Sequence, residues 1–151
     1  MSPCESSANA IPFLLNQDEL KSYGVQRIKV DTNPGYPCRV SLQDAEVGED
    51  VILINFIHHQ VDSPYKSSSP IFIRENTRTA KPKTNEVPIM LQRRFLSVRA
   101  YDEKSMMVGA KVVEGQEFEQ SLRGFFAQDK VSYLHIHNAI PGCYNCKVER
   151  A

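Results

Sequence analysis

The chain has 151 residues, of which 41% are hydrophobic and 24% are charged, and its 18 basic residues balance 18 acidic ones. This composition is typical of one folded domain and argues against a disordered chain. No apolar run approaches the roughly 20 residues of a membrane helix, and the even charge balance argues against a nucleic-acid-binding protein.

The N-terminal residues show no pattern of regular structure. We therefore expect residues 1–10 to be a flexible terminus and residues 11–151 to form a single globular domain. The terminus also lacks the basic and continuous apolar regions of a signal peptide. We expect a cytoplasmic protein in which all four cysteines are free thiols.

Short strands are predicted for most of the first half of the chain. Residues 17–24 are expected to form a short helix that ends at Gly24. Strands are then predicted at 25–31 and 38–44, where apolar and polar residues alternate. Residues 51–57 (VILINFI) are apolar on both sides, which indicates a central strand covered on both faces or a strand of a closed barrel.

The second half continues with strands, interrupted by polar connections. Strands are predicted at 71–75, 94–102 and 107–113, and a hairpin of two further strands ends the chain. The polar loops at 60–70 and 75–90 are long, and long connections are more often functional or mobile than idle.

One helix is predicted at 114–129. Its apolar residues recur at helical spacing and form one stripe: Phe118, Leu122, Phe125 and Phe126. We expect this stripe to pack on a sheet that contains 51–57. The closely spaced strands argue against a parallel, doubly wound sheet, so the predicted fold is α+β and mostly β. It would be a strongly bent antiparallel or mixed sheet, or a partial barrel, with the helix packed on it.

Two histidines lie in the first strand of the terminal hairpin. His135 and His137 are two residues apart, so their side chains should point to the same face. Such a pair supplies two of the four ligands of a zinc or iron site, but histidine pairs also serve as hydrogen-bonded core residues. The sequence therefore predicts no cofactor and no bound metal. His135 and His137 are the candidates for metal ligands. His58 and His59 end another strand and should point to opposite faces, so at most one of them can join the pair.

The register of the terminal hairpin decides what lies beside the two histidines. An even number of loop residues would place one set of side chains there, namely Tyr144, Cys146 and Val148. An odd number would place a more polar set there, namely Cys143, Asn145 and Lys147. In either register the sulfurs of Cys143 and Cys146 should point apart, which argues against a metal knuckle.

Cys38 and Arg99 are the remaining polar candidates. Cys38 lies between Pro37 and Arg39 at the start of a strand, and Arg39 would favour a thiolate there. The candidate catalytic residues are therefore Cys38 as nucleophile and His135 or His137 as its base. The alternative is that Cys38 is a small buried core residue. Arg99 lies between apolar residues and is either an anion-binding group in a pocket or a charge at a sheet edge.

Four segments in this order resemble one bacterial family of domains of unknown function: YPCRVSLQDAEVGEDVILINF, SPYKSSSPIFIRE, LSVRAYDEKSMMV and YLHIHNAIPGCY. The matching hallmarks are Y-P-C-R, S-P-Y…P-I-F, L-S-x-R and H-x-H-N…P-G-C-Y, and they cover nearly the whole chain after about Val25. The resemblance implies a small single-domain cytoplasmic bacterial protein, and it carries no established activity. The residues at motif positions are Tyr36, Cys38, Arg39, Tyr65, Arg99, His135, His137, Asn138 and Cys143.

Two functional hypotheses follow from these residues. In the first, a Cys/His/Arg pocket binds or acts on a small molecule, and an arginine holds its anionic group. The ligand-binding candidates are then Tyr36, Arg39, Tyr65, Arg99, Asn138 and Cys143. In the second, the Cys and His residues are structural and the loops 60–70 and 75–90 meet a partner. Convergence of three or more of the polar side chains on one space would favour the first hypothesis. The sequence leaves open whether the protein is an enzyme and how many copies assemble.

Overall fold

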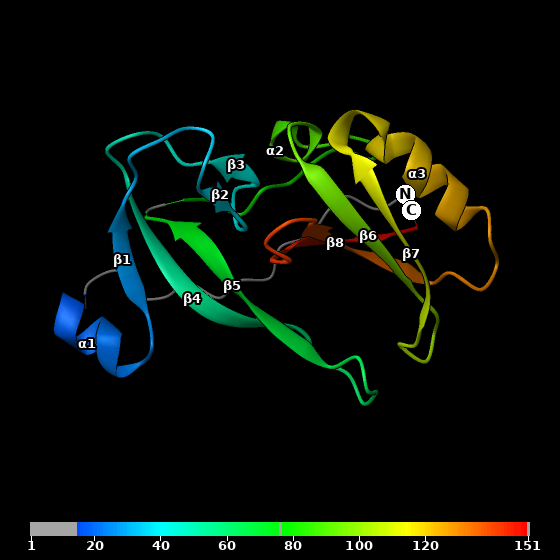
Figure 1. The fold of residues 1–151 in the computed structure, drawn as a ribbon, viewed down its shortest axis with the longest axis horizontal. Helices are drawn as coiled ribbons and strands as arrows, with labels where there is room; N and C mark the ends of the chain where they lie inside the picture. The colour runs from blue at the N-terminus through cyan, green and yellow to red at the C-terminus, as the bar shows by residue number, and fades with distance from the viewer. Residues whose placement is uncertain (1–14, 76, 151) are drawn as a thin grey trace.

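The computed structural model describes residues 15–75 and 77–150. These residues form two β-sheets that lie next to each other, with α3 (Phe118–Phe126) over the second sheet (Figure 1). The predicted α+β, mostly β class is confirmed. In place of one bent sheet the chain builds two, and neither closes into a barrel. In the same residues we find no helix with the length and apolar character that crossing a membrane requires.

The first sheet has the strand order β1–β4–β5–β2–β3. Its antiparallel centre is formed by β1 (Gln26–Lys29), β4 (Asp50–His59) and β5 (Ser67–Arg74). The short β2 (Pro37–Cys38) runs parallel to β5 and pairs with β3 (Gln43–Asp44). The sheet therefore contains both parallel and antiparallel strand pairs, and such a mixed sheet is one of the predicted alternatives.

The helix α1 (Gln17–Ser22) precedes this sheet and ends as predicted. Asn16 caps it by accepting a hydrogen bond from the backbone N–H of Glu19, whose carboxylate accepts one from Asn16 in return. Gly24 follows with φ of +69°, a left-handed conformation that glycine adopts without strain. The short N-terminal helix was thus predictable from its local signals alone.

The prediction of one strand over residues 38–44 is wrong. The chain turns between β2 and β3, where the backbone N–H of Leu42 donates to the carbonyl of Cys38 at 3.0 Å. Leu42 has a φ of +52°, which no strand residue adopts. Val40 and Leu42 are buried in two different clusters, so their alternation comes from a turn that reaches into the core.

The strand β4 contains the apolar run at 51–57, and it is not covered on both sides along its length. Val51 and Ile52 are fully buried at its start, where β4 lies between β1 and β5. Towards its end, Asn55 and Ile57 are exposed. The expectation of a doubly covered strand therefore holds only for the first residues of the run.

The second sheet is antiparallel, with the order β7–β6–β8–β9. Its central strands are β6 (Phe95–Tyr101) and β8 (Tyr133–Asn138), flanked by β7 (Met107–Glu114) and β9 (Tyr144–Glu149). One face of β6 and β8 carries the apolar core: Leu96, Val98, Ala100, Leu134 and Ile136. The opposite face carries the polar and aromatic residues that form the site.

The helix α3 covers the apolar face of this second sheet. The 3₁₀ turn η1 (Gly115–Glu117) leads into it, so regular helix begins later than predicted. Phe118, Leu122 and Phe126 are buried as expected, whereas Phe125 is only half-buried. The expected partner is wrong, because residues 51–57 belong to β4 of the other sheet. Helical periodicity identifies the apolar face of a helix, but it does not identify the sheet that covers it.

The two sheets meet along a seam between β5 and β9. The backbone N–H of Tyr144 donates to Ser69 Oγ at 3.0 Å, and Arg39 Nε donates to the carbonyl of Tyr144 at 2.7 Å. The ring of Phe56 on β4 lies 6.2 Å from that of Tyr144. Tyr144 is therefore in contact with side chains of β4, of β5 and of the turn that follows β2, and the site residues gather around it.

Candidate functional site: a histidine cluster between the sheets

His135 and His137 lie on the same face of β8, as predicted. Their ring centroids are 6.3 Å apart, and their cross-strand partners on β6 are Arg99 and Ser97. Leu134 and Ile136 point the other way, into the core under α3. Both histidines are nearly inaccessible to solvent, since the face that carries them is turned towards the first sheet.

The hairpin adopts neither of the two registers expected for it. Ile136 pairs with Cys146, whereas His137 pairs with Tyr144, so Asn145 is an extra residue in a β-bulge. The bulge changes the side-chain parity within β9. Tyr144 and Lys147 therefore both lie on the histidine face, while Cys146 joins the core. Alternation along the sequence cannot reveal such an extra residue.

A second bulge brings two more histidines to the cluster. In β4 the register shifts between Phe56, opposite Ser69, and His59, opposite Ser67. The rings of His58 and His59 then lie 5.6 Å and 4.6 Å from that of His135. The prediction that at most one of them joins the pair is wrong, because strict alternation does not survive a bulge. His58 was therefore missed as a site residue.

His58, His135 and His137 form a candidate metal-ligand set. One ring nitrogen of each lies within 4.8 Å of the others. Each ring also has a buried nitrogen without a hydrogen-bond partner, namely His58 Nδ1, His135 Nδ1 and His137 Nε2. His137 Nδ1 donates to the carbonyl of Gly142 at 2.9 Å, because a carbonyl can only accept. His137 Nε2 therefore carries a free lone pair, the form in which histidine binds a metal.

His59 differs from these three, since both of its ring nitrogens are occupied. Nδ1 donates to the carbonyl of Tyr65 at 2.8 Å, and Nε2 shares a hydrogen bond with the hydroxyl of Tyr133 at 2.8 Å. The ring also contacts Tyr101 at 4.5 Å between centroids. His59 is thus a hydrogen-bonded packing residue that supports the cluster. The hydrogen bond from His59 also places Tyr65, a predicted ligand-binding residue, at the edge of the histidine cluster.

Burial holds the three candidate ligands in the neutral form. It is the main cause that lowers the pKa of His58 to about 4, of His135 to about 2 and of His137 to about 3. Electrostatic repulsion from neighbouring basic groups acts in the same direction, from His59 on His58 and His135 and from Arg99 on His58 and His137, while the hydrogen bond to the carbonyl of Gly142 partly offsets the lowering of the pKa for His137. Neutral imidazole is the state that a metal ion requires, so no proton has to leave these rings at neutral pH.

Arg99 supplies a positive charge next to the cluster. It is half-buried and lies opposite His135 in the sheet, and its Nε donates to Ser97 Oγ at 3.3 Å. In residues 15–75 and 77–150 it takes part in no ion pair. The structure thus brings Arg99, His135 and His137 close to one another on one face of the second sheet.

The other predicted ligand-binding residues are divided. Arg39, Asn138 and Cys143 line a separate cavity of about 460 Å³ at the turn between β8 and β9. Tyr36 is not among its lining residues. The hydroxyl of Tyr36 donates to Asp31 at 2.9 Å, and its ring packs edge-on against Phe72.

Cys38 is a buried core residue with no exposed surface. Its Sγ accepts hydrogen bonds from the backbone N–H groups of Ser41 and Arg74 at 3.5 Å and 3.3 Å. Its apolar neighbours are Val40, Ile71 and Ile73, and across the described residues it makes no hydrogen bond to a histidine. This geometry gives no support to a Cys38–His nucleophile and base pair, which stays a prediction.

The expectation that all four thiols are free is wrong. Cys146 is disulfide-bonded, whereas Cys38 and Cys143 are free. The expectation came from the missing signal-peptide pattern, which is only indirect evidence about the state of an individual cysteine.

Cys143 should be alkylated by iodoacetamide in the native protein on the order of tenfold or more faster than Cys38. Cys143 is partly exposed, whereas Cys38 must wait for local opening of the first sheet. Peptide mapping by mass spectrometry after timed labelling measures both rates in one sample. Equal rates would mean that the first sheet opens readily around Cys38.

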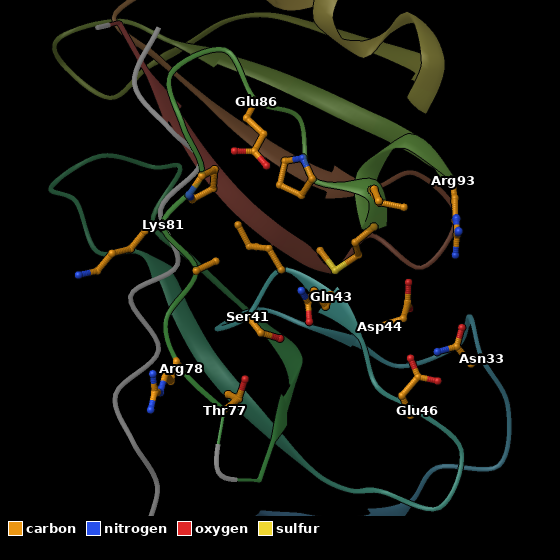
Figure 2. A pocket seen from close by; sticks show the side chains of 16 residues that line it. Asn33, Ser41, Gln43, Asp44, Glu46, Thr77, Arg78, Lys81, Glu86 and Arg93 are labelled. Carbon is orange, nitrogen blue, oxygen red and sulfur yellow. The ribbon is translucent and has the colours of Figure 1, made fainter.

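A larger cavity of about 760 Å³ lies elsewhere, beside β3 and α2 (Ile89–Gln92). Figure 2 shows its charged side chains spread around the hollow, with Arg78 and Lys81 on one side and Glu46 and Arg93 on the other. None of the residues predicted for the site lines it. Charges that do not converge on one point are a poor basis for a specific site, so we place the candidate site at the histidine cluster.

Comparison with known protein families identifies a family for the chain. No curated protein and no solved structure matches the chain. A family model with the description "Protein of unknown function (DUF1203)" matches residues 35–150, a range that includes every candidate residue from Tyr36 to Cys143. The predicted resemblance to a family of unknown function is thereby confirmed. The chain belongs to the DUF1203 family.

Proposed function

We propose that the protein binds a divalent transition-metal ion of the zinc type through His58, His135 and His137. The observation that carries this proposal is the convergence of three ring nitrogens, from two different sheets, within 4.8 Å of one another. Zinc–nitrogen bonds of about 2.0–2.1 Å in a tetrahedral site separate the ligand atoms by roughly 3.4 Å. Nitrogens that are as much as 4.8 Å apart would therefore approach each other by up to about 1.4 Å on binding, which ring rotations can supply.

Buried nitrogens without partners support the same proposal. A buried polar atom left unsatisfied costs about 1–3 kcal/mol, and each of the three rings contains one. A single bound ion would satisfy one nitrogen of every ring. The hydrogen bond from His137 Nδ1 to the carbonyl of Gly142 is the kind of outer contact that orients a metal-binding histidine.

Three protein ligands leave one position of a tetrahedral ion open, which is the arrangement of catalytic rather than structural zinc sites. Arg99 lies opposite His135 without an acidic partner among the described ion pairs, so a ligand at the open position would be favoured if anionic. This retains the hypothesis of a small, anionic molecule, with the metal in place of Cys38. A bacterial, cytoplasmic setting remains a prediction from the motif resemblance.

Zinc titration of the metal-free, untagged chain tests the proposal. We expect one ion to bind per chain in isothermal titration calorimetry, and His137→Asn to weaken binding about 100-fold. Asparagine can still donate to the carbonyl of Gly142 from the position of Nδ1, but it has no atom in the position of Nε2. His58→Ala, at a half-buried position, should weaken binding to a similar extent with less risk to the fold.

His59→Gln is the matched control. His59 lies in the same cluster, yet both of its nitrogens are used in hydrogen bonds, so zinc affinity should stay within about threefold of the parent chain. Circular dichroism shows whether each variant is folded. If the folded parent chain binds no zinc, or if the His58 and His137 variants bind it as the parent does, the metal proposal fails. The histidines are then structural, and the interaction-module hypothesis becomes the better one.

A further inference from the structure

A second cavity, the Arg39 pocket, lies at the turn between β8 and β9 and is separate from the histidine cluster. Its volume of about 460 Å³ is within the range of small-molecule sites. Phe72 of the first sheet and Phe95 of the second contribute apolar walls, and Pro141 closes the turn side. The polar lining includes Arg39, Asn138 and Cys143. The pocket thus combines apolar walls with a small number of polar groups.

Arg39 is the charged group of this pocket, and it is held in a fixed orientation. Only 2% of its surface is exposed. Its Nε donates to the carbonyl of Tyr144 and its Nη1 to the carbonyl of Pro37. Both bonds go to neutral acceptors, and Nη2 makes no hydrogen bond to any residue described. One edge of the guanidinium is therefore left for a molecule in the cavity.

The charge of Arg39 has no acidic partner, in contrast to its neighbour. Arg94 also lines the pocket, but it forms an ion pair with Asp44 and donates to the carbonyl of Met90 at 2.6 Å. The ion pairs seen between residues 15 and 150 do not include Arg39. A buried charge without a counter-charge is costly, and an anion in the cavity would remove that cost.

Arg39 remains a cation at neutral pH. Burial is the main cause that lowers its pKa to about 10, and Arg94 lowers it further, while Cys143, Cys38 and Asp44 act in the opposite direction. Because pH 7 lies well below this pKa, the guanidinium keeps its proton. A positive charge is therefore present for a ligand to meet.

We propose that the Arg39 pocket binds a small organic carboxylate, with the carboxylate on the guanidinium of Arg39 and the apolar part between Phe72 and Phe95. A guanidinium matches the planar geometry of a carboxylate, and the apolar walls favour a ligand that is more than an inorganic ion. This inference does not depend on metal binding at the histidine cluster, because it uses other residues and a cavity that the three histidines do not line.

Benzoate is a suitable probe, since it joins a carboxylate to a flat apolar ring. We expect benzoate to bind the full chain with a Kd on the order of 1 mM or tighter, as measured by chemical-shift titration. Benzamide, its neutral analogue, and inorganic phosphate, which has no apolar part, should each bind at least about tenfold more weakly. Benzoate should also slow the alkylation of Cys143 in proportion to its occupancy, because Cys143 lines the same pocket.

Two variants distinguish a direct contact with the charge of Arg39 from a general attraction of benzoate to a positively charged surface. Arg39→Met should weaken benzoate binding at least about tenfold. Arg78→Gln removes an exposed arginine that does not line the pocket and should change the affinity by less than about twofold. If Arg39→Met does not fold, the three probes and the protection of Cys143 still decide the matter on the parent chain.

The inference is overturned if no binding is seen at a benzoate concentration on the order of 10 mM, which is about tenfold above the expected Kd. It is also overturned if benzamide or phosphate binds as tightly as benzoate, or if bound benzoate leaves the alkylation rate of Cys143 unchanged. Loss of zinc binding in the histidine variants without any change in benzoate affinity would leave this inference standing, so the two proposals fail separately.

Discussion

Replacing Phe118 with alanine is expected to lower the free energy of unfolding by about 3–5 kcal/mol. Phe118 is 2% exposed and packs with Leu122 and Phe126 against the apolar face of the second sheet. Removing its ring leaves a cavity at the centre of the largest core cluster, where the surrounding strands cannot collapse to fill it. Urea unfolding followed by circular dichroism measures the loss.

Phe125→Ala is the matched control on the same helix. Phe125 is half-buried, and its ring edge lies only 3.2 Å from where a Cβ on Gly109 of β7 would be. Its replacement should cost about 1–2 kcal/mol, because part of the ring is already in water. Equal losses for the two variants, or a loss below 1 kcal/mol for Phe118→Ala, would show that α3 does not hold the second sheet as described.

The metal-free protein is expected to lose stability steeply as the pH falls below about 6.5. Burial lowers the pKa of His135 to about 2 and that of His137 to about 3, whereas in the unfolded chain both groups protonate near 6.5. Between these values the unfolded state binds more protons than the folded state, so lower pH favours unfolding. Two such groups give a slope of about 3 kcal/mol per pH unit between roughly pH 6 and pH 4. His58 is left out of this figure because it is half-exposed.

Comparison with His137→Asn isolates this effect from the carboxylates, which also titrate in acid. Above pH 6.5 the stability that depends on neutral histidines is fully present. The free energy of unfolding should therefore change with pH at nearly the same slope in the variant and in the parent chain. Between pH 6 and pH 4 the slope of the variant should be smaller by about 1.4 kcal/mol per pH unit, one proton's worth. Urea titrations at several pH values measure both slopes. Identical slopes would mean that His137 is protonated in the folded chain.

Local periodicity predicted several parts of this structure correctly. Spacing of two placed His135 and His137 on one face of a strand, and spacing of 3.6 identified Phe118, Leu122 and Phe126 as the buried stripe of α3. Each of these signals arises within one element. They do not depend on which other part of the chain packs against it.

The parts that could not be predicted depend on extra residues or on distant partners. A β-bulge adds one residue without a change in composition, so alternation could not show that both His58 and His59 reach the cluster, or that Tyr144 and Lys147 share its face. The packing of α3 on the second sheet, where it contacts β6 and β7, rather than on β4, is likewise decided by tertiary contacts. Arg39 was a candidate from its motif, but only the fold shows that its charge is buried without a counter-charge.

The bulge at Asn145 makes the terminal hairpin more sensitive to its length than to its composition. On one side of the bulge Tyr144 faces the histidines, and on the other side Lys147 does, although the two are three residues apart. Deletion of Asn145 itself would restore regular alternation and leave the other side chains on their present faces, because the pairs on both sides of the bulge keep their register. Deletion of Lys147 with the bulge retained would instead turn Val148 out of the core and Glu149 into it. A conservative substitution in β9 can be absorbed by repacking, whereas the loss of one regular residue exchanges the inside and the outside of the strand beyond it.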